Sequence, residues 1–533
     1  MKSLCRPLAT GIFAILSLCG NAQIIAQQPT AVLGIRSVDS LLDDADFVGE
    51  KTGTPGIKQQ AEGFLEALTG GRGLEGVDRT KPLGMYAEVG EDGPKPGPVI
   101  FLPISDQDAF IEVLKAVAPD LEESDGIMSM SINGRPLQGV ISDGYFFASP
   151  EEGALDELHN PAEIINEDYD IALDINIADI PENLKSVFLT TVESEGRANL
   201  ENSPQPATEA EAAGREFGFE KSLAVMKALV NEGETITIGI DVDAETGMAT
   251  VDLGFTSIEG SELAGSMKAF SELTPMFAAA VPENSPLALV ISHPTTGILK
   301  DLDQLFDQIQ KSAESEIDED INLQNDEARK VAQEAAAKLI SIFKATASSG
   351  ELHSAVFMTM NEDNQVGFVA ATQLEKTSDI QPLLEQLAAE QNQDGKERLK
   401  LNADKYKGAS IHEAIPAADF QDELLGSENA HLAVTKNSVI GGIGHSNLSA
   451  VKSVLDSTSE EVDEETAPIY LIVQPARLVT IFEKNDEALL ERAGSIAGTD
   501  GDFLEISIEP DDLGATLHIE FSLDLIGLGG RGR

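Results

Sequence analysis

Ser446 is the candidate nucleophile with the most suggestive surroundings in this chain. It lies in Gly444-His445-Ser446-Asn447-Leu448, between an alternating apolar stretch and an amphipathic one. This segment matches most of the Gly-x-Ser-x-Gly nucleophile elbow, in which a strand-to-helix turn exposes a serine. Leu448 replaces the final glycine, which the elbow needs for close backbone approach. Since Ser is also a preferred helix N-cap, the sequence favours a cap and leaves catalysis by Ser446 and His445 as the alternative.

An earlier segment, Ser149-Pro150-Glu151-Glu152, follows another predicted strand in the same way. Pro in the first turn and an acidic residue at the third position are typical of a helix start. The parallel between the two segments supports the cap interpretation of Ser446.

Acidic spacing raises the question of a calcium site. Asp318-x-Asp320-x-Asn322 begins like an EF-hand loop, whose oxygen ligands alternate along the chain. Leu323 and Arg329 then occupy the positions of the turn glycine and the bidentate glutamate. We therefore predict no defined metal site and no cofactor, and we keep loosely bound calcium at Asp318, Asp320 and Asn322 as an open alternative.

The N-terminus has the features of an export signal. Lys2 and Arg6 precede an apolar stretch from Leu8 to Gly20, which is too short to span a bilayer. Small residues allow cleavage after Ala22 or Ala26, so we predict a signal peptide over residues 1–26. Lipid attachment at Cys19 is the rival interpretation, although Leu18 stands where a small residue is needed. Both cysteines, Cys5 and Cys19, would leave with the signal, so the mature chain would form no disulfide.

Charge excludes several classes of partner. The chain has a formal net charge of −56, and loss of Lys2 and Arg6 leaves 34 basic against 92 acidic residues, or −58. Such a charge repels nucleic acid and anionic membrane surfaces, which bind proteins through Lys and Arg. We therefore expect an envelope or extracellular ligand, no nucleic acid, no transmembrane segment in the mature chain, and a periplasmic or extracellular location.

A single pattern recurs four times along the chain: an alternating strand, helical segments, a strand hairpin and usually a capped helix. In the second unit, Ile171, Leu173 and Ile175 alternate with polar or small residues, which predicts a strand with one buried face. Polar alternate positions favour antiparallel sheets over parallel ones. The predicted fold is therefore α+β, with mostly antiparallel sheets, helices packed on them, and an internal duplication into two similar halves.

Each predicted half contains two units and an extra hairpin. Polar or acidic stretches at Glu193–Ala213 and Glu314–Asp326 are interpreted as loops. The expected bounds are a first half at 27–281, with units near 31–118 and 171–273 and a hairpin at 126–158, and a second half at 282–533, with units near 286–390 and 468–524 and a hairpin at 400–456.

The signal, the acidic composition, the missing mature cysteines, the repeated Leu-x-x-apolar-Phe after strands and the Ser-Asp helix starts resemble uncharacterised exported acidic proteins of planctomycete-type bacteria. The resemblance covers most of the mature chain and implies no activity. We expect a non-enzymatic binding or scaffold protein of the cell envelope or extracellular space, which holds an apolar ligand or binds calcium loosely. A serine hydrolase centred on Ser446 is the alternative.

Overall fold

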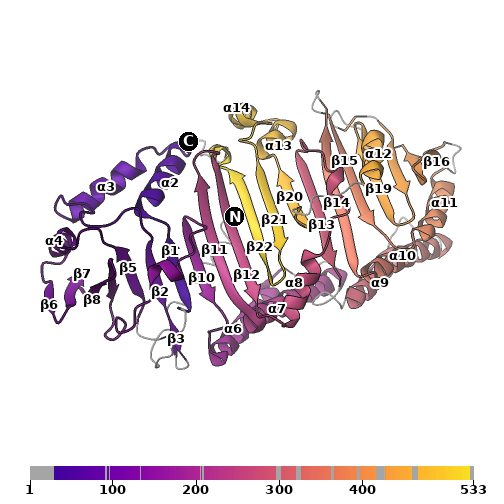
Figure 1. Ribbon diagram of the computed structural model, residues 1–533. Helices are drawn as coiled ribbons and strands as arrows, with labels where there is room; N and C mark the ends of the chain where they lie inside the picture. The colour runs from indigo at the N-terminus through magenta and orange to yellow at the C-terminus, as the bar shows by residue number, and fades with distance from the viewer. Residues whose placement is uncertain are drawn as a thin grey trace. The chain divides into compact units, whose positions relative to one another are not determined.

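The computed structural model describes residues 29–528, except for 91–92, 95–96, 133, 205, 207–208, 296–301, 320–325, 362–364, 393–395, 416–424, 427 and 459–465. The predicted signal peptide, residues 1–26, lies outside the described residues. Within them, 13 α-helices accompany a large antiparallel sheet of 20 strands (Figure 1). A mixed fold built on antiparallel sheet is therefore confirmed.

Two compact units divide the chain. Unit 1 comprises Met1–Thr191, Val230–Ile258 and Ile519–Arg533, and unit 2 comprises Val192–Leu229 and Glu259–His518. Strand β22 (Gly514–Ser522) crosses from unit 2 into unit 1. The predicted halves, 27–281 and 282–533, remain a prediction.

Ten strands of unit 1 pair side by side, each antiparallel to its neighbours. Their order across the sheet is β12 (Met248–Ser257), β11 (Gly233–Asp243), β10 (Ile171–Asn176), β1 (Ala31–Ile35), β2 (Leu83–Ala87), β5 (Val99–Pro103), β9 (Tyr145–Ser149), β8 (Arg135–Ser142), β7 (Ile127–Ile132) and β6 (Glu122–Ser124). The outermost strand, β6, is short and contains two glutamates. A separate ribbon pairs β3 (Val89–Gly90) with β4 (Gly93–Pro94).

Nine strands of unit 2 also pair antiparallel. Their order is β21 (Leu504–Pro510), β20 (Ile469–Val473), β13 (Leu287–Pro294), β14 (Glu351–Met360), β15 (Val366–Gln373), β19 (Ser438–Gly444), β18 (Ala430–Val434), β17 (Ala409–Ala414) and β16 (Leu399–Tyr406). The outermost strand, β16, has a register shift between Lys400 and Asp404, and Asn402 in the shift has φ of +52°.

Two helices follow the first strand of each of the four repeats that the sequence predicts. The pairs are α2 (Val38–Lys51) with α3 (Ile57–Leu68), α6 (Glu182–Asn202) with α7 (Glu209–Glu232), α9 (Leu302–Glu319) with α10 (Asp326–Ala347), and α13 (Pro475–Phe482) with α14 (Glu487–Ile496). The other helices are shorter: α4 (Gln107–Val117), α5 (Pro161–Ile164), α8 (Glu262–Ser271), α11 (Ile380–Gln391) and α12 (Asn447–Ser457). The 3₁₀ turns are η1 (Ala278–Ala280), η3 (Thr377–Asp379) and η5 (Leu523–Gly527).

The predicted loop over Glu193–Ala213 is wrong for most of its length, because α6 continues to Asn202 and α7 begins at Glu209. Glu and Ala are strong helix formers, and Glu193 pairs with Arg197 one turn on. Arg197 also reaches Glu220 of α7 at 2.6 Å and lies over the ring of Phe219. The acidic residues thus form ion pairs within α6 and between α6 and α7.

Two further predictions from the sequence are wrong: a predicted loop is partly helical, and a predicted helix is a series of turns. The predicted loop Glu314–Asp326 is helical as far as Glu319, where α9 ends. The helix predicted after Ser149 is absent, because residues 151–156 form turns. The Ser149 hydroxyl accepts a hydrogen bond from the amide of Glu151 at 3.3 Å, so it stabilises a turn instead of a helix start.

The main core of unit 2 lies on one face of its sheet. Phe357, Val290, Val369 and Ile440 project from neighbouring strands and pack under α12 and the turn at η1. In unit 1, Phe101 and Phe147 form part of a similar buried cluster, which α5 and the segment before it cover. Short, locally packed elements therefore cover this face in both units. In unit 1, α4 also covers the opposite face over β7 and β9, where Phe110 packs with Met128 and Phe146.

We predict a strong asymmetry between adjacent residues of β14. Phe357→Ala should lower the free energy of unfolding by about 3–5 kcal/mol, because Phe357 is 1% exposed and its loss leaves a cavity. The neighbouring Val356→Ala should cost less than about 1 kcal/mol, since Val356 is 42% exposed on the other face. Urea unfolding would measure both, and equal costs would contradict the different burial of Phe357 and Val356.

Candidate ligand-binding face

Ser446 occupies the turn from β19 to α12, but it does not cap the helix. Its φ is +56°, in the left-handed region, and its side chain makes no capping hydrogen bond. Gly444 before it also has a positive φ, so the chain turns sharply within three residues. A left-handed Ncap directs the hydroxyl away from the free amides of the first turn, which explains why the predicted cap is wrong.

Asn447 makes the contacts that hold this turn. It is fully buried, and its amide nitrogen donates to the carbonyl oxygens of Gly444 at 2.6 Å and Asn429 at 3.0 Å. Its side-chain oxygen lies 2.6 Å from Nδ1 of His431. Sequence reasoning singled out the serine, whereas the next residue has the structural role.

The side chains around Ser446 form hydrogen bonds with its backbone. Nδ1 of His445 lies 3.2 Å from Glu428, whose other oxygen accepts a hydrogen bond from the backbone amide of Ser446 at 3.1 Å. No hydrogen bond links the Ser446 hydroxyl to an imidazole or carboxylate within the described residues. Activation of a serine requires such a contact with a base.

The candidate calcium ligands fall on or beyond the end of α9. Asp318 belongs to this helix, whereas Asp320 and Asn322 lie outside the described residues. In the part of the chain that the structure describes, no group of three or more His, Cys, Asp or Glu side chains is arranged to hold a metal ion.

A different serine and histidine do meet in unit 2. The Ser292 hydroxyl lies 2.8 Å from Nδ1 of His353 on the adjacent strand, and Nε2 of His353 lies 3.2 Å from Glu351. Ser292 has no exposed surface, so a substrate has no access to its oxygen. The β13–β14 register brings these residues together across 61 positions, which residue spacing alone did not reveal.

The more extensive feature of unit 1 is an apolar sheet face that the described residues leave partly exposed. Direct cross-strand partners have their side chains on the same face. A central row of such partners crosses the strands from β12 to β5, and two flanking rows cross those from β12 to β2. We call them the apolar face of unit 1: Leu253, Ile238, Leu173, Leu33, Met85 and Ile100 in the central row, with Val251, Ile240, Ile171, Ile35, Leu83, Phe255, Ile236, Ile175, Ala31 and Ala87 beside it.

None of these side chains is buried. Leu253 is 41% exposed and Ile100 47%. The opposite face of the same strands includes buried residues such as Val32 and Ala172. Exposed apolar patches of this extent typically mark binding surfaces. The predicted apolar alternation in β10 is confirmed, but its expected burial is only partial.

Unit 2 has a corresponding surface. Its central row crosses β21, β20, β13, β14 and β15, and Val356 is its most exposed large residue. We call the set the apolar face of unit 2: Ile506, Leu471, Leu289, Val356 and Ala370, with Ile508, Ile469, Ile291, Leu504, Val473 and Leu287 beside them. None of these residues is buried either.

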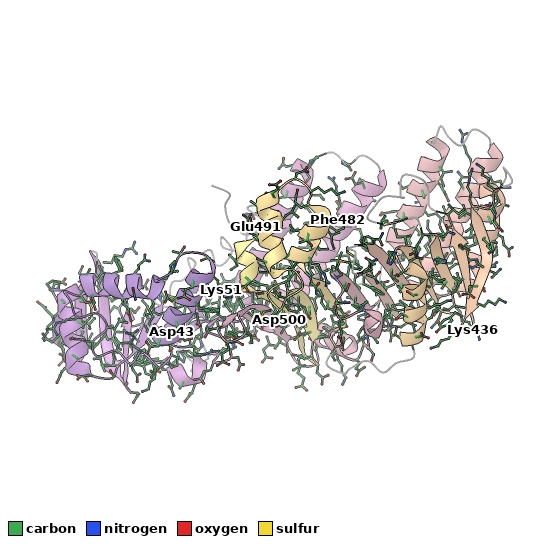
Figure 2. All side chains as sticks on the ribbon, turned by 90° about the horizontal axis from the view of Figure 1, so that it is seen from above. Asp43, Lys51, Lys436, Phe482, Glu491 and Asp500 are labelled. Atoms are coloured by element: carbon green, nitrogen blue, oxygen red, sulfur yellow. The ribbon has the colours of Figure 1, made fainter. Side chains whose placement is uncertain are left out.

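Helices cover the margins of the unit 2 face. Ile481 of α13 packs on Met358, two residues along β14 from Val356, and Ile342 of α10 packs with α11 at the other margin. Figure 2 shows α13 and α14, which carry Phe482 and Glu491, rising from one side of the sheet. Further apolar side chains on the flanking helices are exposed, including Leu339, Phe343 and Phe482.

The face of β10, β11 and β12 opposite the apolar face carries many polar side chains, so the two faces of these strands differ in character. Thr237 donates a hydrogen bond to Asp174 at 2.6 Å, and the Tyr169 hydroxyl donates to Asp252 at 2.8 Å. Burial, together with the hydrogen bond to Asp252, raises the pKa of Tyr169 above its usual range. These strands therefore direct their hydrogen-bonding groups to one side and their hydrocarbon to the other.

Comparison with protein-family models, curated proteins and solved structures finds no match to this chain. Among the described residues, no helix combines the length and the apolar character needed to cross a membrane.

The turn before α12 yields a prediction that separates Ser446 from Asn447. Ser446→Gly should raise the free energy of unfolding by about 1 kcal/mol, because glycine accepts a left-handed conformation without strain. Asn447→Ala should lower it by about 2 kcal/mol or more, since buried partners lose their hydrogen bonds. Thermal and urea unfolding would measure both changes, and a loss of stability in Ser446→Gly would restore the cap interpretation.

Proposed function

We propose that this chain is an exported, non-enzymatic binding protein that holds an apolar ligand on its open sheet faces. The observation that carries the proposal is the apolar face of unit 1, where sixteen side chains share one side of six strands and none is buried. Exposing so much hydrocarbon costs free energy in water, about 25 cal/mol for each Å² that a ligand could cover. Export rests on the sequence of residues 1–26.

The composition of the faces favours an uncharged hydrocarbon ligand such as an acyl chain. No charged side chain belongs to either face as defined, so neither offers an ion pair to a ligand. The formal charge of −58 expected for the mature chain also disfavours anionic ligands at long range.

We further propose that the two faces derive from an internal duplication. Strand order supports it, because the nine strands from β11 to β6 in unit 1 and the nine from β21 to β16 in unit 2 follow the same sequence of connections, with β21 corresponding to β11. The registers agree as well: Leu33 pairs with Leu173 at the centre of β1–β10, and Leu289 with Leu471 at the centre of β13–β20.

Hydrogen bonds at the ends of these strand pairs match in the same way. The amide of Arg36 donates to the carbonyl of Asp170 at 2.9 Å, and the amide of Ser292 donates to that of Pro468 at 2.8 Å. At the opposite ends, Asn176 donates to Thr30 at 2.8 Å and Gln474 to Pro286 at 2.9 Å. A duplicated design predicts two equivalent ligand sites in each chain.

Binding of the uncharged dye Nile red to the mature protein would test the proposed function. We expect fluorescence enhancement with two sites per chain. Leu253→Gln and Val356→Gln, one on each face, should each weaken one site about fivefold, because each removes roughly 1 kcal/mol of apolar contact.

Ile127→Gln provides the matched control. Ile127 is 44% exposed, similar to the two test residues, but it lies on the other side of the sheet from the apolar face, next to buried Met128. It should leave dye binding unchanged. No dye binding, or equal loss in all three variants, would refute the assignment of the ligand to these faces.

A further inference from the structure

Three carboxylates and one hydroxyl meet where α2 lies against the ends of β1, β10 and β11 in unit 1. The Ser40 hydroxyl oxygen lies 2.8 Å from Oδ1 of Asp170 and 3.2 Å from Oδ2 of Asp44. Arg36 extends one guanidinium to Asp170 at 2.8 Å and to Asp241 at 3.0 Å. These contacts connect the first turns of α2 to three strands.

Counting hydrogens shows that the cluster lacks one donor when all three acids are ionised. Asp170 accepts from Arg36, from Ser40 and, at 2.9 Å, from the backbone amide of Val242. An aspartate carboxylate can accept all three of these hydrogen bonds. Ser40 has a single hydroxyl hydrogen, so at any moment it donates either to Asp170 at 2.8 Å or to Asp44 at 3.2 Å. When it donates to the nearer oxygen, that of Asp170, its own oxygen presents only lone pairs to Asp44.

A proton on Asp44 completes the chain. The acid then donates to the Ser40 oxygen, and Ser40 donates to Asp170. Without that proton, Asp44 and Ser40 face each other as two acceptors, and Asp44 also adds a third negative charge beside Asp170 and Asp241. Arg36 alone cannot neutralise three carboxylates.

Other charged groups around α2 have different partners. Lys58 of α3 pairs with Asp43, Arg79 pairs with Asp39 and with Glu62 of α3, and Lys51 pairs with Asp524 of η5. The amide of Lys58 donates to Asp46. Among the described charged groups, Arg36 is therefore the cation that faces Asp44.

We propose that a proton shared along Asp44, Ser40 and Asp170 fastens helix α2 to the strand ends, so that the helix loosens as its surroundings become less acidic. The residues of this site are different from those that form the apolar faces. It gives an exported protein a response to external acidity.

The electrostatics agree in direction. Burial, then the charge of Asp170, raises the pKa of Asp44 from 3.8 to about 6, and burial also raises the pKa of Asp241. In the folded chain Asp44 thus keeps its proton to a higher pH than in the unfolded chain. Its contribution to stability is complete below pH 4 and is lost as the pH rises through about 6.

Hydrogen exchange of the full mature protein, read by mass spectrometry on peptides within Val38–Lys51 and corrected for intrinsic exchange rates, tests the proposal. We expect α2 to open about tenfold more often at pH 7.5 than at pH 5, a factor that corresponds to one pKa unit because solvent reduces the effect. In Asp44→Asn this difference should disappear, since the side-chain amide donates to Ser40 at every pH.

Asp43→Asn is the matched control, one residue away on the same helix. Asp43 is exposed and pairs with Lys58, so this variant should keep the pH dependence of the wild type. Equal protection of wild-type α2 at both pH values would overturn the proposal. So would a pH dependence that survives in Asp44→Asn or is lost in Asp43→Asn.

Discussion

In unit 1 and in unit 2 alike, the register of one strand pair is the constraint on which the rest of the sheet depends. β1 pairs with β10, and β13 with β20, in registers that place leucines opposite each other at the centre. Side chains alternate along a strand, so a slip of one residue would exchange the two faces completely. The hydrogen bonds at both ends of each pair, such as Arg36 to Asp170, fix that register. Every row of apolar partners across the sheet follows from it.

A fixed register places apolar side chains on both faces of the sheet, and the helices cover the second face only in part. Short elements such as α12 close one face, whereas α13 and α10 reach only the margins of the other in unit 2. The hydrocarbon between those margins remains in contact with water. Such a surface is unfavourable for the chain alone, and this cost is the driving force available to anything apolar that covers it.

Local pattern was sufficient to predict the strands of the repeated pattern, such as β10, since alternation and turn residues mark strands and hairpins. It failed at Glu193–Ala213, because acidic residues that look like a solvated loop also form helices when an arginine such as Arg197 lies one turn away.

Alternation in β10 predicted which side chains share a face. It did not predict coverage, because coverage depends on where distant connections pass. Arg36 and Asp170 are 134 residues apart, so only the strand register brings their cluster together.

The strands β6 and β16, at one end of the paired strands of unit 1 and of unit 2, have a consequence for self-association. β6 is three residues long and acidic, and β16 contains a register shift together with Lys400 and Lys405. Charged, interrupted or very short outer strands are poor templates for another chain to extend by backbone hydrogen bonding. The protein therefore combines an adhesive hydrocarbon surface with borders that resist fibril-like growth. Backbone pairing between copies is therefore disfavoured at β6 and at β16.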